Sequence, residues 1–66
     1  MRATVNGTPV ELAEGSTVAA VVARLCPSDQ GVAVAVDREV VPRSAWDEVV
    51  LREGALVEVV TAAAGG

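Results

Sequence analysis

Few side chains in this sequence could carry out chemistry by themselves. The 66 residues include no histidine and no lysine, and the only cysteine is Cys26. The chain therefore lacks an imidazole base, a Schiff-base amine and a phosphate-loop lysine. One cysteine cannot form an internal disulfide or a cysteine-rich metal site, and without a histidine to activate it we interpret Cys26 as a small packed hydrophobe. The composition predicts a protein that is not an enzyme and that binds no metal or cofactor of its own.

The group most available for chemistry is the backbone carboxylate at the end of the sequence, after Ala62-Ala63-Ala64-Gly65-Gly66. These residues are too small to pack, so residues 62–66 are expected to form a mobile tail. Five extended residues span roughly 16 Å at about 3.3 Å each, enough to enter a recessed site in a partner. Glycine has no Cβ, so Gly66 fits a narrow channel and adopts backbone angles that other residues cannot. The residues alone leave open that this is only a frayed end.

A free carboxylate is a poor electrophile until one of its oxygens is made into a leaving group. The chain has no Gly-x-x-x-x-Gly-Lys-Ser/Thr loop that could hold ATP for this purpose. Any activation of the Gly66 carboxylate must therefore come from another protein.

Charge and hydropathy argue against two classes of partner. Nine carboxylates against five arginines give a net charge of -4, which repels nucleic-acid backbones and anionic lipid surfaces. No uncharged apolar run approaches the length that spans a membrane, and the chain reaches a turn at Asn6-Gly7 before a signal-peptide region can develop. Because an unpaired Cys26 also fits a reducing compartment, the sequence predicts a soluble cytoplasmic protein with no nucleic-acid or membrane partner.

The Asn6-Gly7 pair predicts an opening β-hairpin, because both central positions of a type I′ turn need positive φ. A two-residue loop pairs Ala3 with Val10, which places the apolar residues of both strands on one face. Pro9 has no N–H to donate, so the second strand is expected at an edge of the sheet.

One amphipathic helix is predicted after this hairpin, with Ser16 or Thr17 as its N-cap. Its apolar residues fall at the spacing i, i+3, i+4, i+7 and are all expected in the core: Val18, Val21, Val22 and Leu25. Pro27 should end the helix, because a residue before proline is pushed out of the α region.

A second hairpin is predicted from residues 32–36, a turn at Asp37-Arg38 and a return through residues 39–42. A tight turn over residues 43–46 should follow, with Trp46 sealing the core rather than anchoring a partner. Residues 47–51 are expected to cross the domain and Glu53-Gly54 to form a turn.

The last strand is predicted over residues 55–61, with Val57 and Val59 on its buried face. The opposite face, which the helix cannot cover, carries Leu56, Glu58 and Val60. Two apolar residues flanking a carboxylate on an open sheet face are candidates for a partner-docking patch.

The order of elements is strand, strand, helix, two strands and a final strand, which predicts an α+β fold for residues 1–66 as a single domain. One sheet must cover one helix for either to bury its apolar face. The first hairpin and the helix supply a crossover, so the last strand can pair in parallel with the first.

The sequence resembles the thiamine-pathway sulfur carriers of the ThiS family, within the ubiquitin-like β-grasp superfamily. The resemblance runs the whole chain and implies one mixed sheet packed on one helix, with a flexible C-terminal tail. Ala55 departs from an Asp-Gly-Asp turn that is common in the family. The matching features are the Asn6-Gly7 hairpin, Gly15-Ser16-Thr17-Val18 at the helix start, Val40-Val41-Pro42-Arg43 followed by Trp46, the Glu53-Gly54 turn, and the terminal Gly65-Gly66.

The resemblance also implies a chemistry for the tail. An adenylyltransferase of the ubiquitin-activating type would use ATP to adenylate the Gly66 carboxylate, recognising Gly65 and Ala64 alongside it. Sulfur from a persulfide, supplied indirectly by a cysteine desulfurase or another donor, would then give a C-terminal thiocarboxylate. This thiocarboxylate would donate sulfur to thiazole synthase for thiamine biosynthesis, so the chain is a substrate and not an enzyme.

Three alternative functions stay open at this stage. A molybdopterin-synthase small subunit uses the same chemistry for a different acceptor, although the length and the Val-Pro-Arg-x-x-Trp segment argue against it. A ubiquitin-like protein modifier would instead join Gly66 to a lysine of a target. A plain interaction module would make no use of its tail.

Overall fold

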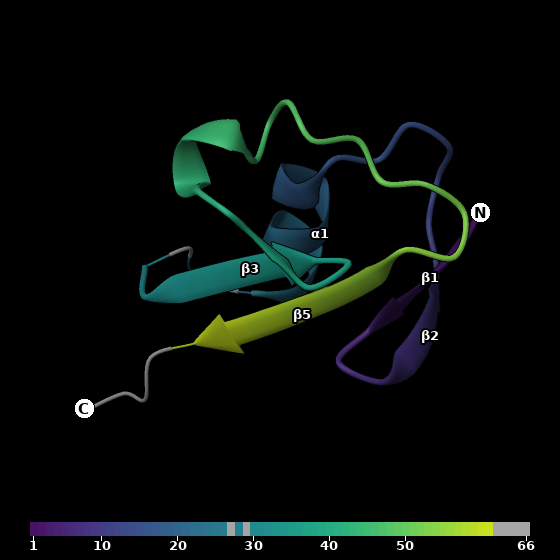
Figure 1. Cartoon of the computed structure of the whole chain (residues 1–66), viewed down its shortest axis with the longest axis horizontal. Coiled ribbons are helices and arrows are strands. Elements are labelled where there is room, and N and C mark those ends of the chain that lie inside the picture. The colour runs from purple at the N-terminus through teal and green to yellow at the C-terminus, as the bar shows by residue number, and fades with distance from the viewer. Residues whose placement is uncertain (27, 29, 62–66) are drawn as a thin grey trace.

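The computed structural model of the chain, in which residues 1–26, 28 and 30–61 are described, has one mixed sheet with one helix packed on it (Figure 1). The strand order is β2-β1-β5-β3-β4, and only the β1–β5 pair is parallel. This arrangement confirms the predicted α+β β-grasp fold. The elements are β1 (Arg2–Val5), β2 (Thr8–Glu11), α1 (Val18–Leu25), β3 (Val32–Val36), β4 (Glu39–Val41), the 3-10 helix η1 (Arg43–Ala45) and β5 (Leu56–Thr61).

The β1–β2 hairpin has the predicted register, with Ala3 opposite Val10. Asn6 and Gly7 have φ of 50° and 82°, the left-handed conformations that a type I′ turn requires. Strand β2 lies at the edge of the sheet, as the missing N–H of Pro9 predicts. The short turn therefore fixes which face of both strands is buried.

Helix α1 begins at the predicted cap, because the Thr17 side chain accepts a hydrogen bond from the backbone N–H of Ala20 at 3.2 Å. The backbone N–H groups of Val18 and Ala19, which have no acceptor within the helix, donate to the carbonyls of Val49 and Trp46 at 3.0 Å each. Residues 46–49 therefore satisfy the first donors of the helix. Among the described helices, none is long and apolar enough to cross a membrane.

The core assignment of the helix is correct except at its end. Val18, Val21 and Val22 are buried, but Leu25 is 45% exposed, so its predicted place in the core is wrong. Leu25 is the last helical residue, and Cys26 already has extended backbone, with φ -118° and ψ 129°. Cys26 packs against the core instead. In this helix of eight residues Leu25 is the i+7 position, and it lies beyond the last buried helical residue, Val22.

Strands β3 and β4 form the predicted second hairpin, with Val36 opposite Glu39. The turn residues Asp37 and Arg38 both have positive φ, at 50° and 71°. The 3-10 helix η1 follows where a tight turn was expected, and brings Trp46 into the core at 5% exposure. The Trp46 indole N–H donates to the carbonyl of Val41 at 3.0 Å, so its one polar atom is satisfied.

The core lies between the helix and one face of the sheet and is almost wholly aliphatic. Val18 of the helix and Val57 of the sheet are completely buried and belong to the same core cluster. With Trp46 as the only aromatic residue, β-branched packing supplies most of the buried apolar surface. The buried residues are Ala3, Val5, Leu12, Val18, Val21, Val22, Val34, Val41, Trp46, Leu51, Ala55 and Val57.

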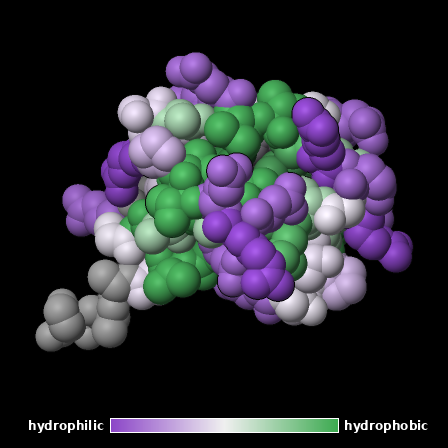
Figure 2. All heavy atoms as spheres, in the orientation of Figure 1, coloured by the Kyte–Doolittle hydropathy of each residue, from purple (hydrophilic) through white to green (hydrophobic). Residues whose placement is uncertain are grey.

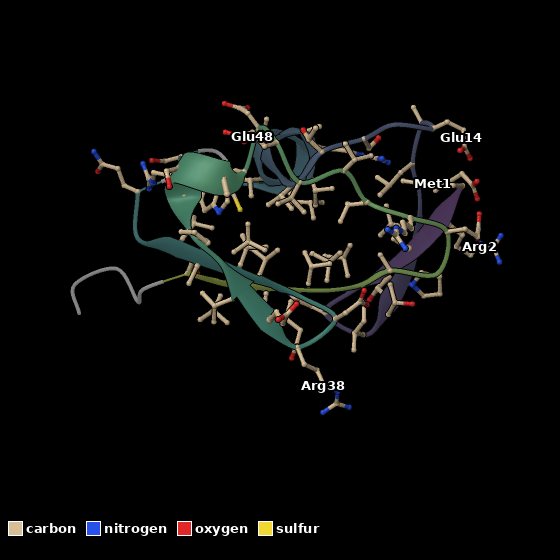
Figure 3. All side chains as sticks on the ribbon, turned by 45° about the horizontal axis from the view of Figure 1, so that its top comes forward. Met1, Arg2, Glu14, Arg38 and Glu48 are labelled. Carbon is tan, nitrogen blue, oxygen red and sulfur yellow. The ribbon has the colours of Figure 1, made fainter. Side chains whose placement is uncertain are left out.

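The N-terminal amino group closes the first hairpin. It donates to the carbonyl of Leu12 at 2.8 Å and lies 3.3 Å from a carboxylate oxygen of Glu11 and 3.6 Å from one of Glu14. Figure 3 shows Met1 and Glu14 together at this end of the molecule. Desolvation lowers the pKa of the Met1 amino group, but Glu11 and Glu14 outweigh it and raise this pKa above its ordinary value of 8.0.

Truncating Val22 should destabilise the domain, because Val22 is only 3% exposed in the helix–sheet core. We expect Val22→Ala to lower the free energy of unfolding by about 1 to 3 kcal/mol, since the lost packing outweighs the better helix propensity of alanine. Val50→Ala is the control, because Val50 is 54% exposed, and it should change stability by no more than about 0.5 kcal/mol. Urea denaturation gives both values. An unchanged midpoint for Val22→Ala would show that the Val22 side chain is not part of the core.

The raised pKa of the Met1 amino group makes stability depend on alkaline pH. The folded state holds this proton more tightly than the unfolded chain, so the stabilisation is complete below pH 8.0 and is lost as pH rises through the folded-state value. We expect the melting midpoint to fall above pH 8 and the fall to be smaller in N-terminally acetylated protein. The side chains are the same in both forms, so the difference between the two pH profiles reports the amino group. Identical pH profiles would contradict the prediction.

Candidate functional site

The residues predicted to carry the chemistry, Ala64, Gly65 and Gly66, lie outside the described part of the structure. The site must therefore be built from the strand that leads to them. β5 is the central strand of the sheet, between β1 and β3, and its last residue, Thr61, is also the last that is described. Five residues separate Thr61 from the end of the sequence.

The two sides of β5 are supported differently. On one side, β3 pairs with it from Val57 to Thr61. On the other side, β1 is in register only with Leu56 and Val57. Beyond that point the Asn6 side chain takes over: its Nδ2 donates to the carbonyl of Val59 at 3.0 Å and its Oδ1 accepts from the Val59 N–H at 2.9 Å. The end of β5 therefore has a strand on one side and one carboxamide on the other.

The predicted docking residues lie on the sheet face away from the helix, as expected from the alternation along β5. Val60 is 64% exposed and Glu58 is exposed, but Leu56 is only partly exposed. Leu56 also lies at the start of β5, five residues before Thr61. Val60 and Glu58 are therefore better placed near the tail than Leu56 is.

Strands β3 and β4 extend this surface with residues that the sequence analysis did not single out. Ala33 is opposite Val60, Ala35 is opposite Glu58, and Val40 is opposite Ala35. Val40 is 78% exposed, the highest value among the exposed large hydrophobic residues of the described chain. We call the surface formed by Ala33, Ala35, Val40, Glu58 and Val60 the exit patch; it borders a shallow depression of about 200 Å³.

Figure 2 shows hydrophobic side chains gathered over β3 and the end of β5. Glu58 is the only ionisable residue of the exit patch. The Arg38 side chain projects outward from the β3–β4 turn (Figure 3). The exit patch is therefore an apolar surface with one carboxylate, on the strand that leads to the tail.

Cys26 lies on the helix side of the sheet, away from the exit patch. It is partly buried and lines a groove of about 440 Å³ together with Trp46 and Arg43. The Arg43 guanidinium lies 5.3 Å from the centre of the Trp46 ring, a cation–π contact. The placement of Cys26 against the core agrees with its interpretation as a packing residue.

Within the described residues, no group of three or more His, Cys, Asp or Glu side chains is placed to hold a metal ion. The described side chains of the exit patch include no nucleophile and no proton-transfer pair. What the arrangement offers is a fixed strand end beside an apolar surface, suited to presenting the residues that follow Thr61 to another protein.

Comparison with known proteins gives a family match and several similar solved structures, including two from Geobacter metallireducens. The chain matches the ThiS family over residues 3–66. It is similar to the crystal structure of a thiamine biosynthesis protein (ThiS) from Geobacter metallireducens, with 32% sequence identity, 100% of each chain covered and a TM-score of 0.84. It is also similar to the NMR structure of a thiamine biosynthesis protein from the same organism, with 33% identity, 100% of this chain and 88% of that chain covered, and a TM-score of 0.82. Among curated proteins, a search finds no match.

Proposed function

This chain belongs to the ThiS family, and we propose that it is a cytoplasmic sulfur carrier of thiamine biosynthesis whose working group is the Gly66 carboxylate. The observation that carries the proposal is the family match, which continues to residue 66 and so includes the Gly65-Gly66 pair. The fold adds support, because the central strand of the sheet leads directly to the tail.

In the proposed cycle, a partner of the ubiquitin-activating type adenylates Gly66, using ATP that the partner itself binds. The carboxylate oxygen attacks the α-phosphorus of ATP, and pyrophosphate leaves. The outer sulfur of a persulfide, supplied indirectly by a cysteine desulfurase or another donor, then attacks the acyl carbon and AMP leaves, which gives an acyl disulfide. A second thiol of the partner attacks the inner sulfur of this acyl disulfide, so that the C-terminal thiocarboxylate is released and the two partner sulfurs remain joined as a disulfide. Thiazole synthase accepts the sulfur. The carrier supplies the carboxylate and its presentation, and no cofactor of its own.

We propose that the exit patch docks both the adenylating enzyme and the acceptor. Five extended residues reach roughly 16 Å beyond Thr61, so an enzyme that holds Gly66 must lie against the end of the domain where Thr61 is. The exposed residue next to Thr61 is Val60, and Ala33 is its neighbour on β3. Glu58 and the net charge of -4 favour a partner surface that is apolar with basic surroundings.

Placing a charge in the exit patch should separate docking from folding. We expect Val60→Asp to change stability by no more than about 1 kcal/mol, because Val60 is 64% exposed, but to raise the KM for adenylation at least about tenfold. Val50→Asp is the matched control, since Val50 is 54% exposed and is bridged to Thr17 at the start of the helix. ATP–pyrophosphate exchange with the cognate adenylating enzyme measures both variants. An unchanged KM for Val60→Asp would move the docking surface elsewhere.

The tail itself provides the sharpest test of the carrier function. Deleting Gly66 should leave stability within about 0.5 kcal/mol of wild type, because the residue lies beyond β5. Adenylation and thiocarboxylate formation should both be lost, since the shortened carboxylate cannot occupy a preorganised site. Gly66→Ala keeps the length but adds a Cβ beside the reacting carbon and should also be strongly impaired.

Ala62→Gly is the control for these tail variants, because it alters the tail at a distance from the reacting carbon and should react at the wild-type rate. Pyrophosphate exchange and intact mass of the product give the readouts. Wild-type rates in both Gly66 variants would refute the carrier function. Recovery of wild-type protein joined to target lysines, without sulfur, would favour a protein modifier instead.

A further inference from the structure

Asn6 makes contacts that its position in a turn does not require. The type I′ turn needs only the positive φ of Asn6 and Gly7, which asparagine tolerates with its side chain in solvent. Instead, the Asn6 carboxamide reaches β5 and bonds both the carbonyl and the N–H of Val59, at 3.0 and 2.9 Å. The backbone N–H of Asn6 donates in addition to the carbonyl of Val57 at 2.9 Å.

These contacts extend the β1–β5 ladder with a side chain. The backbone of β1 reaches only as far as Val57 in the parallel register, and the Asn6 carboxamide then presents a donor and an acceptor to Val59 as a further peptide group would. Val59 lies between Glu58 and Val60 of the exit patch, two residues before Thr61. We call the two hydrogen bonds between the Asn6 carboxamide and Val59 the Asn6 clamp. The clamp holds the part of β5 that carries the docking surface and that leads to the tail.

We propose that Asn6 is a positioning residue of the sulfur-carrier reaction; this inference rests on the proposed function. Its carboxamide fixes the end of β5 relative to the exit patch, so that a partner docked on the patch receives Gly66 at one place. Without the clamp, β5 beyond Val57 is supported by β3 alone, and its end can twist away from the sheet. Docking would survive, but the carboxylate would be delivered to a wider range of positions, and reaction rates fall steeply with such displacement.

The other hairpin turn provides a matched comparison. Asp37 also has a φ of 50°, and its Oδ1 accepts a hydrogen bond from the N–H of Leu56 at 3.0 Å. This clamp holds the start of β5 rather than its end. Asn6→Gly and Asp37→Gly each remove a side-chain clamp on β5 from a left-handed turn position where glycine is unstrained. Both variants should lose stability through the loss of these side-chain hydrogen bonds. They differ in which end of β5 is released.

The test combines amide exchange in the free carrier with adenylation kinetics on the cognate enzyme. In Asn6→Gly we expect the Val59 amide to exchange at least about tenfold faster and kcat for adenylation to fall at least about fivefold, with KM within about twofold of wild type. In Asp37→Gly the Leu56 amide should exchange faster, while kcat and KM stay within about twofold. Asn6→Asp keeps the acceptor for the Val59 N–H but not the donor, and should show a smaller fall in kcat.

Several results would overturn this inference. An unchanged Val59 exchange rate in Asn6→Gly would show that the clamp is not formed. An equal fall in kcat for Asp37→Gly, or a loss confined to KM, would mean that Asn6 acts only through general stability or docking. Wild-type kinetics in Asn6→Gly would overturn the positioning role while leaving the carrier function intact. If wild-type carrier is not adenylated at all, the proposed function fails with it.

Discussion

The parallel contact between β1 and β5 joins the two ends of the described chain, and the other elements are arranged around it. Thr4 and Val5 lie opposite Leu56 and Val57, and the Thr4 N–H donates to the carbonyl of Ala55 at 2.9 Å. Parallel neighbours need a crossover between them, which here runs through α1. The crossover places the helix on one face of the sheet, and Val57 is fully buried in the core between them. The same contact that forms the core therefore puts the strand that leads to the tail in the middle of the sheet.

A sheet with two free edges invites pairing with other chains, and this one limits that risk at both edges. At β2, Pro9 lacks an N–H, and the Arg24 guanidinium donates to the carbonyl of Glu11 at 2.9 Å. At β4, the strand has only three residues and is followed by Pro42. With both edges blunted, pairing at the edges is disfavoured, and the exposed apolar side chains of the exit patch lie on the open sheet face instead.

The sequence predicted the local features well because single residues determine them. Asn6-Gly7 sets the first hairpin, Thr17 caps the helix, and Cys26 is extended before Pro27. What it missed depends on residues far apart. Val40 belongs to the exit patch only because β3 lies beside β5, and the Asn6 clamp joins residues 53 positions apart. Leu25 was misplaced because periodicity shows which face a residue occupies, not where the packed surface ends.

The physical demands on the body and the tail of such a protein are opposed. A carboxylate that another enzyme activates, as proposed for Gly66, cannot be buried, whereas the aliphatic core that holds the small domain together is formed within residues 3–57. The fold can influence the chemistry only through where β5 ends and what surrounds it. Two side-chain clamps from the two hairpin turns, Asn6 and Asp37, hold that strand from opposite sides and at opposite ends. Turn residues that first fix the register of the hairpins thus also fix the strand from which the tail begins.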